Sequence, residues 1–191
     1  MIRETSAPAE EAVSLAEAKA HLKVDFTADD DYITALITAA RQQAEEYTNL
    51  ALVDTTYEQA FDGFPATTRL NPHQSLVLWR SPVISVTSLV YTAEDGTSTT
   101  EPSANYKVDT YRKPGSISPV YGYSWQSAQD IPASVVVTFR AGYADAASVP
   151  APIKQALLLM IGAWYDNRED SVYNLPTQSR VMLDHYRVSR F

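Results

Sequence analysis

The chain has 191 residues, no cysteine and a formal net charge of −8. The lack of cysteine excludes disulfides, thiolate metal sites and a cysteine nucleophile. The acidic balance disfavours DNA or an anionic membrane as the main partner. The amino-terminal residues lack the apolar stretch of a secretory signal, and the longest uncharged apolar segment is about half the ~20 residues that a membrane span needs. We therefore expect a soluble intracellular protein.

The first fifty residues predict a polar tail and two helices. Residues 1–13 are polar and rich in Ala and Glu, which is typical of a tail. Ser14 and Glu17 have the spacing of a capping box, so a short helix should begin there and end near Val24. The aspartates at 29–31 suit the start of a second helix through its dipole better than a calcium loop. Apolar residues at helical spacing carry that helix to about Asn49.

The pattern then changes to strands. Segments rich in β-branched and aromatic residues, separated by proline and glycine turns, predict strands at about 55–61, 76–79, 83–91, 105–110 and 134–140. Asp95-Gly96 between polar flanks indicates the tip of a hairpin. Residues 54–147 are therefore expected to form a small antiparallel β subdomain.

A helix that is apolar on most of its surface follows. Pro150 and Pro152 suit a helix start, and no charged residue falls between Lys154 and Asp166. Such a helix must be buried on most sides, so we expect one side to face the chain's own core and the other a second subunit. The Leu175-Pro176 pair breaks the chain before a last short helix.

We expect an α+β fold in which the amino- and carboxy-terminal helices form one helical bundle with the β subdomain inserted. The expected domains are residues 1–53, 54–147 and 148–191, with 14–53 packing on the last segment. In particular, one core should bring together the apolar side chains Ile33, Leu36, Ile37, Leu157, Met160 and Ile161.

No catalytic, cofactor-binding or metal-binding residue is predicted. His21, His73 and His185 have no metal-helix spacing, and no phosphate-binding glycine loop or nucleophile elbow occurs. Glu45-Glu46 is interpreted as a solvated helix face or as an ion-pair partner for Arg41. The charged residues Asp166, Arg168, Glu169 and Asp170 indicate an exposed helix end or a subunit contact rather than an acid–base pair.

The candidate functional residues are instead aromatic and arginine side chains suited to protein–protein contacts. The segment 121–125 places three aromatics on one loop, where they either anchor the loop to the sheet or bind a partner. The segment 186–191 is expected to leave the core as an arm that docks on a neighbour, with a tail folded back on its own helix as the alternative. The full set is Tyr121, Tyr123, Trp125, Trp164, Tyr165, Tyr186, Arg187, Arg190 and Phe191.

Several motifs together resemble a known family. They are S-L-A-E-A-K-A-H-L-K-V-D and the following D-D-x-Y-I-x-x-L-I-x-A-A-R-Q, the middle W-R-S-P-V-I-S-V-T-S-L-V-Y, and V-T-F-R-A-G-Y with the late apolar helix and L-D-H-Y-R-V. Their order over residues 14–188 resembles that of tailed-bacteriophage head–tail connector proteins, also called adaptor or head-completion proteins.

The resemblance implies a structural virion protein of the neck, made in the host cytoplasm, with no catalysis and no cofactor. It implies a closed ring of about twelve copies that joins the portal protein to a downstream tail or neck protein, while DNA passes through without specific binding. The alternatives are a tail-completion or other neck ring component, a small enzyme, or a ligand-binding β module.

Overall fold

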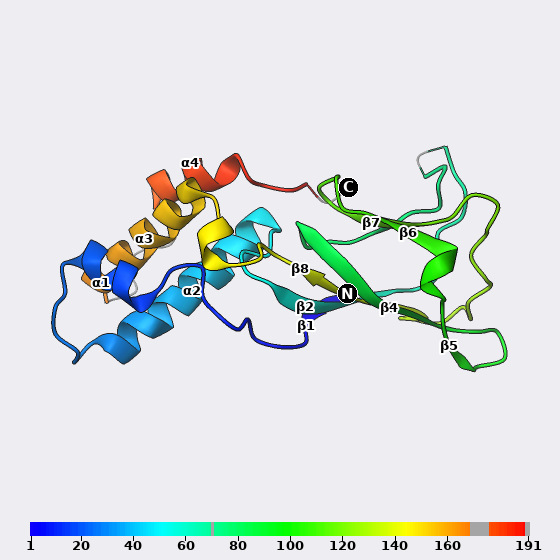
Figure 1. Ribbon diagram of the computed structural model, residues 1–191, viewed down its shortest axis with the longest axis horizontal. Coiled ribbons are helices and arrows are strands. Elements are labelled where there is room, and N and C mark those ends of the chain that lie inside the picture. The colour runs from blue at the N-terminus through cyan, green and yellow to red at the C-terminus, as the bar shows by residue number, and fades with distance from the viewer. Residues whose placement is uncertain (70, 169–175, 190–191) are drawn as a thin grey trace. The chain divides into compact units, whose positions relative to one another are not determined.

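The computed structural model describes residues 1–69, 71–168 and 176–189, and the chain divides into two compact units (Figure 1). The helical unit comprises residues 8–54 and 143–189, and the β unit comprises residues 1–7 and 55–142. Helices and antiparallel sheets coexist, so the expected mixed α+β class is confirmed. The unit boundaries fall at 7/8, 54/55 and 142/143, whereas the boundaries expected from the sequence were at 53/54 and 147/148.

The helical unit contains the helices from both ends of the chain: α1 (Leu15–Leu22), α2 (Asp30–Thr48), α3 (Ala151–Asp166) and α4 (Thr177–Asp184). Figure 1 shows α2 and α3 side by side. Buried apolar side chains of all four helices form one cluster, which includes Ala18, Ile33, Ile37, Leu157, Met160, Ile161 and Leu183, with Leu36 packed at its edge. Among the described residues, no helix has the length and apolar character to span a membrane.

The helix boundaries follow from local signals. The Ser14 hydroxyl accepts a hydrogen bond from the Glu17 N–H (3.2 Å), and the Glu17 carboxylate accepts one from the Ser14 N–H (2.8 Å), so the predicted capping box is confirmed. α1 and α2 both end at residues in the left-handed conformation, Lys23 and Asn49. α3 begins directly after Pro150, where the missing N–H has no cost.

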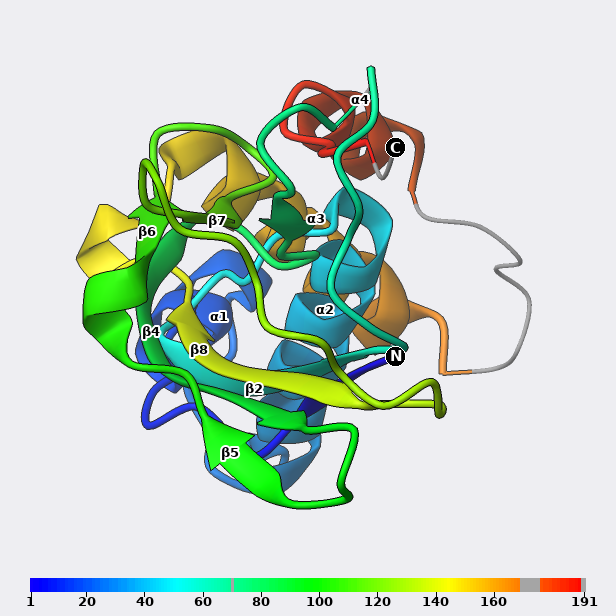
Figure 2. The same ribbon diagram turned by 90° about the vertical axis from the view of Figure 1, so that its right-hand side faces the viewer.

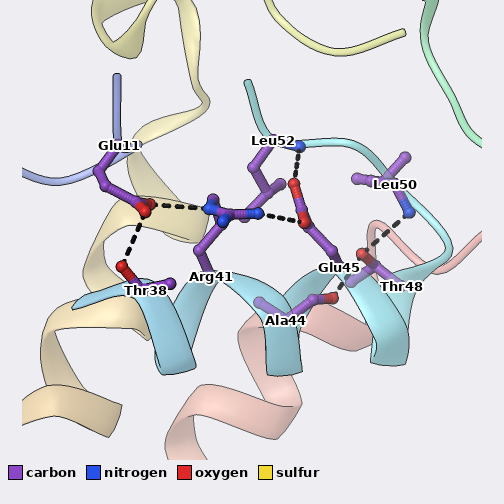
Figure 3. Close-up of polar contacts among 8 residues, drawn as sticks. All are labelled: Glu11, Thr38, Arg41, Ala44, Glu45, Thr48, Leu50 and Leu52. Atoms are coloured by element: carbon purple, nitrogen blue, oxygen red, sulfur yellow. Dashed lines mark hydrogen bonds and ion pairs between the residues drawn. The ribbon is translucent and has the colours of Figure 1, made fainter. Parts of the chain in front are cut away.

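A buried charge network fastens the segments on either side of α2 to that helix (Figure 3). The Arg41 guanidinium donates to Glu11 and to Glu45, at 2.8 Å in each case, and the Glu45 carboxylate accepts from the Leu52 N–H at 2.8 Å. Glu45 is buried, so the solvated-face interpretation was wrong for this residue and the Arg41 ion pair was right. Glu46, by contrast, is exposed.

The β unit contains two antiparallel sheets (Figure 2). The five-stranded sheet has the order β1 (Ile2–Glu4), β2 (Thr55–Phe61), β8 (Val135–Ala141), β4 (Val83–Thr92) and β5 (Ser98–Thr100). The three-stranded sheet has the order β3 (Leu76–Val77), β7 (Ser116–Pro119) and β6 (Tyr106–Asp109). Gln59 of β2 is fully buried and bonds to the backbone at β3, where its amide donates to Val77 O and accepts from Trp79 N, both at 2.8 Å.

The hairpin predicted at Asp95-Gly96 is confirmed. It joins β4 to β5, with Gly96 at φ +85° and the Ala93 N–H bonded to Thr97 O at 2.8 Å. β5 and β7 were not predicted, because both are short and rich in small polar residues, which resemble turns in a sequence pattern.

The amino-terminal tail was predicted wrongly. β1 pairs with β2, and Arg3 forms an ion pair with Glu58 at 2.5 Å. Further along, Ala12 and Val13 are buried in the helical core. Three strand residues with two charges among them have no periodicity that identifies a strand, and the pairing partner lies more than fifty residues away.

Candidate subunit-interaction surfaces

The aromatic loop after β7 is anchored through two of its three aromatic residues. The Trp125 ring stacks on Phe64, with 4.7 Å between ring centroids and 11° between planes, and its indole N–H donates to Gln74 O at 2.8 Å. The Tyr123 hydroxyl donates to Glu101 Oε1 at 2.7 Å. Tyr121 projects into solvent, with its side chain fully exposed. Anchoring therefore accounts for Trp125 and Tyr123 and leaves Tyr121 available for a partner.

The carboxylate that holds Tyr123 is itself buried. Glu101 is only 3% exposed and also accepts a hydrogen bond from the Asn105 amide at 2.7 Å. Burial raises the pKa of the Tyr123 phenol, and its hydrogen bond to Glu101 raises it further. Burial, followed by the charge of Glu101, also raises the pKa values of Tyr91 and Tyr106. Glu101, Asn105 and Tyr123 thus form a hydrogen-bonded cluster that anchors the loop two residues after Tyr121.

Trp164 and Tyr165 of α3 contact other parts of the helical unit. Trp164 is half-buried against the helical core and lines a shallow hollow of about 340 Å³ with the α2 residues Ala39, Gln42, Gln43 and Glu46. The Tyr165 hydroxyl donates to Asp29 at 2.5 Å, which lowers the pKa of Asp29 and raises that of Tyr165.

Arg168 completes this cluster. Its guanidinium lies 3.0 Å from the Asp29 carboxylate and 4.8 Å from the centre of the Tyr32 ring. Arg168 therefore ties the end of α3 to the start of α2, while 57% of its side chain remains exposed, in agreement with the expected exposed helix end. Glu169 and Asp170, predicted in the same cluster, lie outside the described residues.

The carboxy-terminal segment does not leave the core at Tyr186 as predicted. Val188 is buried, its N–H donates to Thr48 O at 2.8 Å, and its carbonyl accepts from the Asn49 amide at 2.8 Å. The Arg187 guanidinium lies 5.4 Å from the centre of the Tyr47 ring. Residues 186–188 therefore fold back on α2, because its last turn offers free carbonyl groups. Arg190 and Phe191 lie outside the described residues.

The three histidines lie apart in the sequence and on different elements: His21 in α1, His73 before β3 and His185 directly after α4. In the described part of the chain, no group of three His, Asp or Glu side chains is placed to hold a metal ion. The polar clusters around Glu101 and around Asp29 consist of side chains that form hydrogen bonds with one another.

The acidity of the chain is concentrated in the helical unit. Residues 8–54 and 143–189 contain 7 Lys or Arg against 15 Asp or Glu, a net charge of −8. Residues 1–7 and 55–142 contain 7 against 8, a net charge of −1. The two units therefore offer surfaces of very different charge to other molecules.

Sequence reasoning missed two exposed aromatic residues. Tyr111, between β6 and β7, is 99% exposed, and Phe26, between α1 and α2, is 50% exposed. Each lies in a polar loop, and the available signal was an aromatic residue with a threonine on one side and a charged residue on the other.

Comparison with known proteins identifies relatives for the fold and for part of the sequence. Residues 12–74 match the family described as "Phage gp6-like head-tail connector protein". This match confirms the resemblance to head–tail connector proteins that the sequence motifs indicated. A search of curated proteins finds no match.

Solved structures share the fold over the whole chain. A chain of the structure described as "Virion of native gene transfer agent (GTA) particle" has a TM-score of 0.80 at 21% identity, over 100% of this chain and 97% of that one. Chains from "Neck of empty GTA particle computed with C6 symmetry" and "Neck of native GTA particle computed with C12 symmetry" have TM-scores of 0.75 and 0.71, both at 22% identity with the same coverage.

Proposed function

We propose that the chain is a structural subunit of a head–tail connector ring in the neck of a virus-like particle. The observation that carries this proposal is the fold similarity to a chain of the gene transfer agent virion, which extends over 100% of this chain and 97% of that one. The connector-family match of residues 12–74 supports it independently. The description of one similar structure with C12 symmetry supports a closed ring of many identical copies.

We infer the finer assignment from the division of the chain into two units. A bundle of amino- and carboxy-terminal helices with an inserted β unit provides two separate bodies, which suits an adaptor that must bind different partners. In this proposal one partner is the portal protein and the other a downstream tail or neck protein. The ring also lines the channel through which DNA passes.

The charge of the chain fits that role. The helical unit has a net charge of −8, and an acidic surface repels the phosphate backbone rather than retaining it. DNA therefore passes the ring without specific binding. The protein performs no catalysis in this proposal, and its polar clusters serve to hold loops and helix ends in place.

The direct test is assembly with the portal ring encoded in the same genome. The purified chain, mixed with that ring, should form a complex whose mass corresponds to a closed ring of copies, measured by native mass spectrometry and imaged by electron microscopy. Removing the gene should produce DNA-filled heads and separate tails that do not join, and a plasmid copy should restore joining.

Two outcomes would redirect the proposal. A chain that binds the tail end but not the portal supports a tail-completion or other neck ring component. A chain that stays monomeric in the presence of both partners, together with normal particles from the deletion strain, contradicts a connector role altogether.

A further inference from the structure

The hairpin between β6 and β7 ends in an aromatic and basic tip. Tyr111, Arg112 and Lys113 are all exposed. The Asp109 carboxylate accepts hydrogen bonds from the N–H groups of Tyr111 (3.0 Å) and Arg112 (3.3 Å), which shapes the turn. Arg112 keeps 77% of its side chain exposed even while it pairs with Asp109, and among the described residues Lys113 has no ion-pair partner.

The base of this hairpin is closely packed. A Cβ on Gly115 would lie 2.7 Å from Val83 Cγ2 and 3.1 Å from Asp109 O, so only glycine allows the backbone to approach β4 this closely. Tyr121 lies on the same side, because it lines with Arg112 a shallow groove of about 400 Å³. This close packing restrains the backbone at the base of the tip, which lowers the backbone entropy that is lost on binding. We call Tyr111, Arg112, Lys113 and Tyr121 the tip surface.

The loop between α1 and α2 has the opposite character. Residues 25–31 contain four aspartates and no Lys or Arg. Two of the aspartates form ion pairs within the helical unit, whereas Asp25 and Asp31 are exposed and have no ion-pair partner among the described residues. Between them Phe26 is 50% exposed, and its backbone carbonyl accepts a hydrogen bond from the Lys19 ammonium at 2.6 Å. We call Asp25, Phe26 and Asp31 the acidic loop surface.

The two surfaces are complementary. Each combines an exposed aromatic ring with unpaired charge, and the charges have opposite signs. A ring of identical subunits requires two different patches that fit each other, because a head-to-tail contact joins different patches of the same chain, and this pair meets that requirement. Aromatic and arginine side chains are also the residues enriched at interfaces.

We propose that the tip surface of one copy docks on the acidic loop surface of the next copy. Arg112 and Lys113 then lie against Asp25 and Asp31, and Phe26 stacks on the exposed tyrosine rings. The contact rests on the proposed ring function, and it names the pair of surfaces that sets the order of subunits around the ring.

The test uses two charge-reversed variants. In the first, Arg112→Glu and Lys113→Glu make the tip acidic. In the second, Asp25→Lys and Asp31→Lys make the loop basic. Each variant alone brings like charges together and should self-associate at least about tenfold more weakly than wild type near 0.15 M salt. An equimolar mixture should recover association, because the acidic tip of the first variant meets the basic loop of the second, and the reverse contact is wild type.

The mixture separates a contact between copies from a contact within one chain. The two variants should alternate around each ring, so native mass spectrometry should find them in equal numbers. A chain that carries all four reversals should also assemble alone. If the contact lay within one chain, the four-fold variant would recover association and the mixture would not, which would overturn the proposal.

Matched control variants reverse the same number of charges at exposed residues outside the two surfaces. Arg69→Glu with Arg180→Glu, and Glu94→Lys with Asp130→Lys, alter exposed residues outside the two surfaces and should leave association near wild type. Because all these positions are exposed, thermal melting should show normally folded chains.

The failure of this proposal is distinguishable from failure of the proposed function. Wild-type rings together with unimpaired rings of the first variant overturn the docking contact and leave the connector function standing. A wild-type chain that forms no ring, with or without the portal ring, overturns both.

Discussion

Replacing Gln59 by leucine tests how the two sheets of the β unit are held together. The Gln59 side chain is fully buried and bonds to Val77 O and Trp79 N, both at 2.8 Å. Leucine has a similar volume but can neither donate nor accept. The substitution therefore removes both bonds while filling most of the same space.

The expected loss follows from the groups left behind. A buried donor or acceptor without its partner costs about 1–3 kcal/mol. Val77 and Trp79 are half-buried, so water can partly replace the lost bonds, and we expect ~2–4 kcal/mol of lost unfolding free energy in total. For a unit of this size, that corresponds to a fall in melting temperature on the order of 10–20 °C.

The assay is thermal and urea unfolding, with hydrogen exchange followed on peptides from β2 and β3. Exchange should accelerate in both strands, because the link between them is lost. As a matched control, Gln43→Leu changes an exposed glutamine and should alter stability by no more than about 0.5 kcal/mol. If Gln59→Leu is as stable as this control and exchanges like wild type, the side chain does not hold the sheets together.

Three further changes probe the helical unit. Leu157→Asp should prevent folding of the helical unit, because the buried site offers the new charge no partner. Leu157→Ala should lower the unfolding free energy by about 2–5 kcal/mol. A Leu157→Asp chain that melts normally would contradict the shared core. Ser14→Ala should cost about 1 kcal/mol in urea unfolding. The Ser14 N–H lowers the pKa of Glu17 most, followed by hydrogen bonds from Lys154 and from the Ser14 hydroxyl, which together bring it to about 2. This contribution to stability is present above about pH 4.5 and is lost as the pH falls toward 2. Ser14→Ala removes only the part due to the hydroxyl, so the loss of stability at low pH should become smaller, and equal pH profiles would show that the hydroxyl adds nothing. Deleting residues 187–191 should lower the melting temperature of the purified chain, because it removes the bonds of Val188 to Thr48 and Asn49; melting equal to that of wild type would show that the folded-back segment adds no stability.

The sequence by itself determined the features whose causes lie within a few residues. The capping box at Ser14 and Glu17 satisfies its own helix end, so its spacing alone predicts the start of α1. The Asp95-Gly96 turn has the same local basis, since Gly96 supplies the positive φ. The stripes of α2 and α3 identified the core for a related reason: burial of one helix face imposes its period on the sequence.

Only the tertiary structure decided which aromatic and charged residues remain available to partners. Trp125 and Tyr121 are both aromatic residues of one loop, yet Trp125 stacks on Phe64, some sixty positions away, and Tyr121 meets solvent. Whether a side chain is buried depends on which distant residue packs against it, and a local sequence pattern does not include that residue.

The same reason explains the errors at the two ends of the chain. β1 exists because β2 offers its edge, and Val188 folds back because the last turn of α2 offers a carbonyl from Thr48. Short polar segments have too little hydrophobic periodicity for their secondary structure to be predicted from the sequence. Their conformation is decided by hydrogen-bonding groups that approach only after the rest of the chain has folded, and for that reason the composition of residues 1–13 indicated a tail where the structure has a strand.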